Sequence, residues 1–142
     1  MYKIRKIEVN DYNKSYFDLL SQLSIVNSND ITFEKFINYV NTLHDKHMIY
    51  VIEKDTCIIS TITIIIEDKI IHTMGRVMHI EDVIVDKNYR GKGLGKMLLQ
   101  YANSIAEKEK CYKIILNCSE ENTNFYEKCD FIKKNIQMAK YI

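Results

Sequence analysis

The order of apolar and polar residues predicts a chain that opens with a strand followed by two helices. Residues Tyr2–Val9 alternate imperfectly, in the manner of a strand. Asp11 is placed to cap a helix whose apolar side chains recur at helical spacing: Tyr12, Tyr16, Leu19, Leu20 and Leu23. A second helix is predicted from about Thr32, with Phe33, Phe36, Ile37 and Val40 on one face.

The middle of the chain has β character. Three segments, Met48–Glu53, Cys57–Glu67 and Ile70–Val85, are rich in Ile, Val and Thr, which favour strands. Asp55 and the pair Asp68-Lys69 are the expected turns between them. These segments therefore predict an antiparallel meander.

The spacing of the apolar residues changes from strand-like to helical after residue 93, where the clearest amphipathic helix begins. Its apolar positions are Leu94, Met97, Leu98, Tyr101, Ala102 and Ile105. A strand over Tyr112–Cys118, a short helix capped by Ser119 and a last strand over Phe131–Tyr141 are predicted to follow. The order βααβββαβαβ indicates an α+β fold, and 142 residues suffice for one domain, residues 1–142.

Composition and charge narrow the possible functions. Lys and Arg number 20 against 19 Asp and Glu, so nothing attracts the chain as a whole to nucleic acid or to an anionic membrane. The four cysteines lack metal-site spacing, no secretory signal opens the chain, and the apolar run at 57–66 is too short to span a bilayer. We therefore expect a cytoplasmic protein with reduced thiols, no metal, and no nucleic-acid or membrane partner.

A glycine-rich loop, RGKGLGK at residues 90–96, joins the third β segment to the amphipathic helix. Glycines let the main chain turn sharply, and the first amides of a helix have no intrahelical partner. The helix dipole and the side chains of Arg90, Lys92 and Lys96 add positive charge. The loop is thus a predicted phosphate-binding site, although a connecting surface turn is the alternative.

The pattern R-x-x-G-x-G at Arg90, Gly93 and Gly95 resembles the pyrophosphate loop of the GNAT acetyltransferase superfamily. The string from Asn122 to Phe131 is similar to its second signature, N-x-x-F-Y-E-K-x-G-F, with Asp130 in place of the glycine. The resemblance implies the GNAT fold, a mixed central β-sheet flanked by helices on both faces, and acetyl-CoA as co-substrate.

Four further strings are similar to one branch of that superfamily, the glucosamine 6-phosphate N-acetyltransferases: HIEDV at 79–83, CYKI at 111–114, LSIV at 23–26 and KIIH at 69–72. The implied reaction is transfer of the acetyl group of acetyl-CoA to D-glucosamine 6-phosphate in a ternary complex, on the route to UDP-N-acetylglucosamine. A homodimer that exchanges its last strand is also implied. The C-terminal arginine that the family uses for the sugar phosphate is absent, and Lys140 is the nearest cation.

The resemblance assigns a role to each candidate residue. Tyr126 is the general acid for the CoA sulfur; Glu81 and Asp82 orient the amine, which the carbonyl of Asn117 holds. CoA is expected along the main chain of Val83, Ile84 and Val85, on the loop residues Arg90, Gly91, Lys92, Gly93, Leu94, Gly95 and Lys96, and beside Asn117, Asn122 and Tyr126. Sugar and phosphate contacts are expected from Ser24, Lys69, His72, Glu81, Asp82, Tyr112, Lys113 and Lys140.

Simpler roles exist for these residues. Tyr126 could be a core tyrosine beside Phe125, and the carboxylates of Glu81 and Asp82 could serve salt bridges. Burying two carboxylates among apolar neighbours is costly, however, which favours a functional role for them. Two other functions also fit the resemblance: an acetyltransferase for another amine, such as a peptide or polyamine, and a non-catalytic module that binds acyl-CoA.

Overall fold

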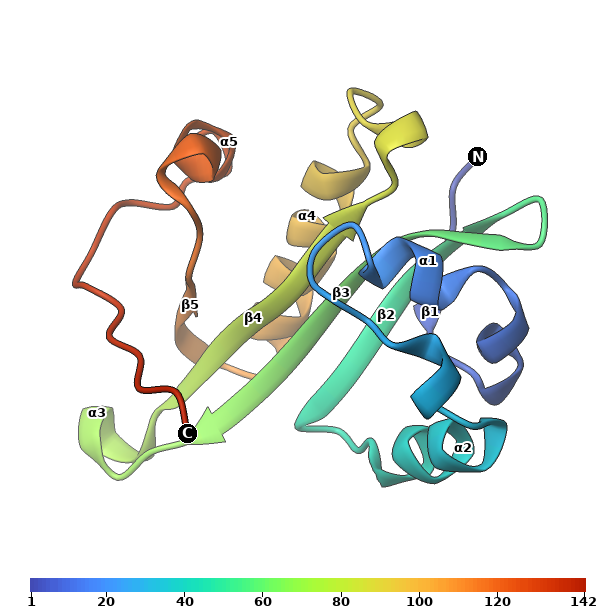
Figure 1. Ribbon diagram of the computed structural model, residues 1–142. Helices are drawn as coiled ribbons and strands as arrows, with labels where there is room; N and C mark the ends of the chain where they lie inside the picture. Colours follow the sequence, from blue (N-terminus) through green and yellow to red (C-terminus); the bar gives the residue numbers. More distant parts are fainter.

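Five strands form one mixed sheet in the computed structural model, which describes residues 1–142 (Figure 1). The strands, adjacent in chain order, are β1 (Ile4–Lys6), β2 (His47–Lys54), β3 (Cys57–Asp68), β4 (Arg76–Val85) and β5 (Cys111–Leu116). β2, β3 and β4 pair antiparallel, which confirms the predicted meander, and β1 pairs antiparallel with β2. β5 lies parallel to β4 because the helix α4 (Leu94–Lys108) carries the chain back between them.

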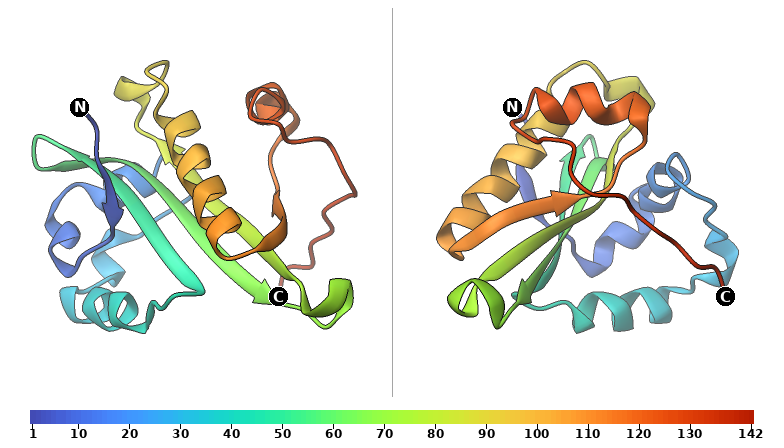
Figure 2. Two further views of the ribbon diagram at one scale, coloured as in Figure 1. Left: turned by 180° about the vertical axis from the view of Figure 1, so that it is seen from behind. Right: turned by 90° about the vertical axis from the view of Figure 1, so that its left-hand side faces the viewer.

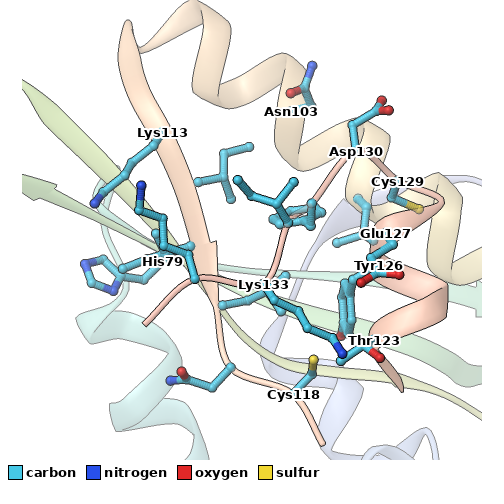
Figure 3. Close-up of a pocket in the computed structure, with 18 of the residues that line it drawn as sticks. His79, Asn103, Lys113, Cys118, Thr123, Tyr126, Glu127, Cys129, Asp130 and Lys133 are labelled. Carbon is cyan, nitrogen blue, oxygen red and sulfur yellow. The ribbon is translucent and has the colours of Figure 1, made fainter. Parts of the chain in front are cut away.

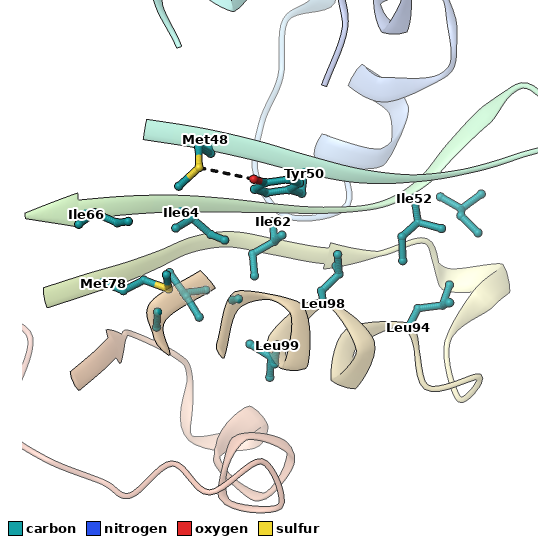
Figure 4. Close-up of a cluster of buried hydrophobic side chains, with 14 residues drawn as sticks. Met48, Tyr50, Ile52, Ile62, Ile64, Ile66, Met78, Leu94, Leu98 and Leu99 are labelled. Carbon is teal, nitrogen blue, oxygen red and sulfur yellow. Dashed lines mark hydrogen bonds between the residues drawn. The ribbon is translucent and has the colours of Figure 1, made fainter. Parts of the chain in front are cut away.

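Helices cover both faces of this sheet, as expected, and each face has its own apolar core. On one face α4 buries Leu94, Leu98 and Ala102 against strand residues such as Ile64 and Met78 (Figure 4). The opposite face packs against α1 (Tyr16–Leu20) and α2 (Phe33–Thr42) through Tyr16, Leu19, Phe36, Ile49, Val51, Ile58 and Ile84. Those strand residues come from β2, β3 and the end of β4, so α1 and α2 leave the β5 side of this face open (Figure 2).

The two helices with the strongest amphipathic pattern form where they were predicted. α4 begins at Leu94 and presents its apolar stripe to the sheet. α2 follows Thr32, whose hydroxyl oxygen accepts a hydrogen bond from the amide of Lys35 at 3.2 Å. This side-chain cap satisfies one of the free amides of the first turn.

The N-terminal predictions were partly wrong. β1 is limited to Ile4–Lys6, a 3-10 helix η1 occupies Val9–Asn13, and α1 is only Tyr16–Leu20. Asp11 does not cap α1: its side chain accepts from the Glu8 amide at 2.8 Å within the turn that starts η1. A buried ion pair, described below, competes with the helix for this carboxylate.

The predicted strand from Ile70 begins six residues later, at Arg76. Residues Ile71–Met74 form the short turn α3, in which His72, Thr73 and Met74 have φ of 54°, 55° and 60°. Three successive left-handed residues cannot continue a pleated strand, so the β3–β4 connection is a wide turn rather than a tight hairpin.

The C-terminal third departs most from its prediction. β5 is followed by the 3-10 helix η4 (Glu120–Asn122) and by α5 (Thr123–Glu127), but the hydroxyl of Ser119 makes no capping bond. Residues 131–142 form no strand, so the predicted last strand is absent from the single chain. They run as an extended, exposed tail (Figure 2), and a strand needs a paired edge that the tail does not meet within its own chain.

A buried ion pair fastens the edge of the sheet at β1. Asp11 is fully buried, and its two oxygens accept from Arg5 at 2.7 and 2.8 Å. Glu53 on β2 contacts the same guanidinium, and Lys14 lies 2.9 Å from Glu53. Burial alone raises the pKa of the Asp11 carboxyl, but bonds from Arg5 and the Glu8 amide, with the charges of Arg5 and Lys14, outweigh it and lower that pKa.

We predict that Asp11→Asn lowers the free energy of unfolding by about 3–5 kcal/mol at pH 7, because it leaves Arg5 without its buried partner. The contribution of Asp11 is present above the ordinary carboxyl pKa of about 4 and is lost as pH falls through the lowered folded-state pKa. Urea denaturation at several pH values measures both effects. The exposed Asp18→Asn is the matched control, and equal stability of the two variants would contradict the assignment.

Candidate functional site

The central feature of the site is the point at which β4 and β5 part. Their parallel pairing runs from Arg76–Cys111 to Ile80–Leu116, where β5 ends. β4 continues to Val85 paired with β3 alone, while the chain after β5 turns toward α5 (Figure 1). Beyond Ile80, as far as Val85, β4 therefore has no neighbouring strand on its β5 side. Its main-chain groups on that side are available for an extended ligand to pair with.

The glycine-rich loop lies directly beyond this stretch of β4. Gly91 and Gly93 have φ of 75° and 81°, a conformation that favours glycine. No side chain caps α4, and the backbone amides of residues 91–96 donate to no other backbone group. Six free amides at a helix N-terminus suit a diphosphate, as the sequence predicted. Arg90 is turned back onto β4, where its Nε donates to the carbonyl oxygen of Val85 at 3.1 Å.

The second signature packs against the first. A Cβ added at Gly95 would lie 2.9 Å from Cζ of Phe125, so the loop and α5 approach as closely as they do because residue 95 has no side chain. Phe125 in turn meets the ring of Tyr126 edge-on, with the centroids 5.0 Å apart. The position of Tyr126 is thus linked by direct contact to the phosphate-binding loop.

A β-bulge sets the direction of the two carboxylates on β4. The register with β3 shifts between Thr61–Ile84 and Thr63–Glu81, and Asp82 has φ of 49°. The extra residue removes the strict alternation that would send Glu81 and Asp82 to opposite faces. Asp82 lies close enough to Tyr39, on α2, to contribute after burial to the raised pKa of that phenol. The carboxylate of Asp82 thus faces the α1–α2 side of the sheet.

The expectation that Glu81 and Asp82 are buried was wrong. Both are exposed, so no desolvation cost has to be explained and the burial argument for their function fails. Ile84, expected beside CoA, is buried in the core under α1 and α2, and only its main chain can meet a ligand.

Tyr126 is half-buried on α5. Burial is the main cause that raises the pKa of its phenol, and the nearby thiols of Cys118 and Cys129 raise it further. A raised pKa keeps the hydroxyl protonated at neutral pH, which suits a proton donor.

A pocket of about 1190 Å³ follows the free edge of β5, bounded by α4, α5 and residues 131–137 of the tail (Figure 3). It brings together six of the predicted site residues: Glu81, Lys96, Tyr112, Lys113, Asn117 and Tyr126. The remaining predicted residues do not line it. Ser24 and Lys140 are exposed elsewhere, Lys69 pairs with Glu67, and His72 stacks on Tyr112 with ring centroids 4.1 Å apart.

The structure adds residues that were not predicted. His79, Cys118, Thr123, Cys129 and Lys133 line the pocket, and Figure 3 shows His79 beside Lys113 at one end with Tyr126 at the other. His79 could have been found from the sequence, because it stands two residues before Glu81 and residues at that spacing share a strand face. Nothing in the sequence pointed to Lys133, since its place depends on the course of the tail.

No group of three or more His, Cys, Asp or Glu side chains is arranged to hold a metal ion. None of the helices has the length and apolar character that crossing a membrane requires.

Known proteins match this chain over nearly all of its length. It is 42% identical to the glucosamine 6-phosphate N-acetyltransferase of Arabidopsis thaliana, over 99% of this chain and 96% of that protein. The Dictyostelium discoideum glucosamine 6-phosphate N-acetyltransferase 1 is 36% identical over 97% of this chain and 89% of its own. The crystal structure of the A. thaliana enzyme superposes with a TM-score of 0.94 at 41% identity, covering 99% of this chain and 98% of that one.

The model of the acetyltransferase (GNAT) family matches residues 4–131, from β1 through the turn after α5. That range includes the glycine-rich loop, the parting of β4 and β5, and Tyr126. Acetyltransferases of this family use acetyl-CoA, in keeping with the free amides and the unpaired side of β4. The chain belongs to the GNAT acetyltransferase family.

Proposed function

We propose that this chain transfers the acetyl group of acetyl-CoA to the amine of D-glucosamine 6-phosphate, giving N-acetyl-D-glucosamine 6-phosphate and CoA. The observation that carries the reaction class is the parting of β4 from β5 beside six free loop amides. The choice of acceptor rests on the nearly full-length similarity to the A. thaliana enzyme. The product supplies the synthesis of UDP-N-acetylglucosamine.

The co-substrate lies along the unpaired side of β4, where β5 has turned away. The loop amides of Gly91–Lys96 bind the diphosphate, with Lys92 and Lys96 adding charge. The pantetheine arm extends along Val83 and Val85 as an added strand would, although the Val85 carbonyl already accepts from Arg90. Asn122 lies at the end of η4, beside α5, where the family's second signature begins.

The amine attacks the thioester directly, without an acyl-enzyme intermediate. The main-chain carbonyl of Asn117, just past the end of β5, and the carboxylates of Glu81 and Asp82 hold and orient the amine. The bond between nitrogen and the acetyl carbon forms, the carbon–sulfur bond breaks, and the Tyr126 hydroxyl gives its proton to the leaving sulfur. The attacking nitrogen loses one proton in the same reaction, and this proton, passed on through solvent, restores the Tyr126 hydroxyl. Tyr126 suits this step because its pKa is raised by burial and it lines the same pocket as Asn117.

The tail supports a homodimer in which residues 131–142 pair with a second copy. It carries Ile132, Ile136, Met138, Tyr141 and Ile142, each at least 79% exposed in the single chain. An extended segment with so much apolar surface is stabilised when it adds to a sheet edge, and β5 has a free edge. We also propose a cytoplasmic location, which the four free cysteines support and cell fractionation would test.

The acceptor is tested by release of CoA thiol from acetyl-CoA with glucosamine 6-phosphate, glucosamine or a lysine peptide as the amine. We expect rapid release with the phosphosugar and far slower release with the other two amines. Faster release with the peptide would indicate a different acceptor. No release with any amine would favour a non-catalytic module that binds acyl-CoA.

Replacement of Tyr126 by Phe removes the proton donor and keeps the ring that packs on Phe125 and Phe131. We predict that kcat falls by about 10²–10⁴-fold while the protein stays folded. Steady-state kinetics and a thermal melt measure the two properties. Tyr2→Phe, a change of the same kind outside the pocket, is the control, and wild-type kcat in Tyr126→Phe would exclude the role.

The dimer is tested by analytical ultracentrifugation of the intact chain and of a chain that ends at residue 130. We predict that the intact chain sediments as a dimer and that the shortened chain sediments as a monomer, because the apolar tail residues are then missing. A monomeric intact chain at micromolar concentration would rule out the exchange.

A further inference from the structure

The turn that joins β4 to the glycine-rich loop is bonded by a side chain from a distant part of the chain. Gln22 lies just after α1, and its Nε2 donates to Oδ2 of Asp86 at 2.9 Å. Oε1 of the same side chain accepts from the main-chain amide of Lys87, also at 2.9 Å. Figure 1 shows the chain after α1 passing beside the end of β4, where these bonds form. One planar amide thus bonds two consecutive residues of the turn.

Few other hydrogen bonds connect this turn, residues 86–90, to the rest of the molecule. The amide of Asp86 donates to the carbonyl oxygen of Ile59 on β3 at 2.8 Å. The other hydrogen bonds of the turn stay within it or join it to the end of β4. Gln22 is therefore the only side chain outside residues 86–90 that forms hydrogen bonds with them.

The two partners of Gln22 require both halves of its amide group. The carboxylate of Asp86 can only accept, and the main-chain N–H of Lys87 can only donate. Burial raises the pKa of the Asp86 carboxyl, but hydrogen bonds from the Asn88 amide and from Gln22 outweigh it and lower that pKa. Asp86 is thus ionised at neutral pH. A side chain with a donor alone, or an acceptor alone, could bond only one of the two partners.

Gln22 is anchored to the core through α1. Its own amide donates to the carbonyl oxygen of Leu19 at 3.0 Å, in the last turn of that helix. Leu19 is fully buried and belongs to the same core cluster as Ile84 of β4. A close-packed core holds such elements in one arrangement. The main chain at Gln22 is therefore fixed relative to the end of β4, and its side chain passes this constraint on to the turn.

The turn separates the two stretches of main chain that the co-substrate is proposed to meet. Val83 and Val85 come before the turn, and the free amides of residues 91–96 follow it. The pantetheine arm and the diphosphate of acetyl-CoA belong to one covalent molecule. Both stretches can bind it at once only if the turn keeps them at one separation and angle. Order that exists before binding removes an entropic cost that would otherwise weaken the affinity.

We infer that Gln22 is a positioning residue for acetyl-CoA, because its bonds to Asp86 and Lys87 hold the glycine-rich loop in line with the unpaired side of β4. Gln22 does not line the pocket, so it acts on the co-substrate through the turn and not by contact. This role rests on the placement of acetyl-CoA proposed above. It makes the affinity for the co-substrate depend on a residue 64 positions before Asp86.

The first test replaces Gln22 by Met, which is also unbranched and lacks the amide donor and acceptor. We expect KM for acetyl-CoA to rise about fivefold, as the loss of one ordinary hydrogen bond implies. We also expect kcat, and KM for glucosamine 6-phosphate, to stay within about twofold. Ser21→Ala, which removes a hydroxyl that donates only within α1, to Phe17, is the control and should match the wild type. An unchanged KM for acetyl-CoA in Gln22→Met would overturn the inference.

Two ligands separate alignment from a general loss of structure. CoA spans the turn, whereas 3′-phospho-ADP, its nucleotide half, reaches only the glycine-rich loop. In calorimetry, CoA should bind Gln22→Met about fivefold more weakly than the wild type, and 3′-phospho-ADP should bind both proteins equally. Equal weakening of both ligands would mean that the loop itself is disturbed, and the alignment role would be wrong.

A paired exchange tests the contact with Asp86. Gln22→Glu keeps an acceptor for the amide of Lys87 but sets a second carboxylate against Asp86, so CoA binding should again weaken. Adding Asp86→Asn supplies a donor to the new carboxylate and leaves an oxygen to accept from Asn88. The double variant should then bind CoA within about twofold of the wild type, a coupling that independent sites do not show. Binding by the double variant that is no better than that of Gln22→Glu would refute the contact's role.

The same calorimetry separates this inference from the proposed reaction. Weaker CoA binding by Gln22→Met supports the positioning role even if no acetyl transfer to glucosamine 6-phosphate is detected. Equal CoA binding by Gln22→Met and the wild type, with normal turnover by the wild type, refutes the positioning role but keeps the reaction. A wild-type protein that binds no CoA would refute both.

Discussion

The functional half of the molecule depends on the separation of two parallel strands. β4 and β5 stop pairing at Ile80 and Leu116, and this single change of direction leaves the β5 side of the end of β4 unpaired. The bulge at Asp82 occupies the same stretch, so both carboxylates stand where the strands diverge. The glycine-rich loop follows immediately, and its free amides continue the line of unpaired main-chain groups. An extended thioester ligand with a diphosphate end needs all three features in this order.

Much of the fold was predictable because its signals are local. The helical stripe from Leu94, the Ile-rich strands and the left-handed glycines of the loop each follow from spacing within a few residues. The segments that were mispredicted depend on distant partners. Asp11 serves a buried pair with Arg5 instead of capping α1, and the turn at residues 71–74 interrupts an apolar run that alone favours a strand. The tail has the composition of a strand but no edge within its own chain.

The candidate site shows the same division. Glu81, Asn117 and Tyr126 meet at one pocket, as the signature strings implied. The contributions of His79 and Lys133 come from register and from the course of the tail, and no short string encodes those. Exposure was also misjudged, because apolar neighbours in sequence do not bury Glu81 and Asp82 when a bulge turns them outward. The motifs thus indicated the acetyltransferase family, whereas the geometry of the sheet determines which side chains line the pocket.

The ion pair between Arg5 and Asp11 has a consequence for how rigidity is distributed. It clamps one margin of the sheet, where β2 and β3 are almost wholly buried, while β5 at the opposite margin is only partly covered. The free energy of local opening is therefore lowest at β5, beside the pocket, and highest toward β2. The part of the sheet around β2 and β3 is rigid, whereas the part around β5 can adjust to bound substrates. Amide hydrogen exchange should therefore slow steadily from β5 toward β2.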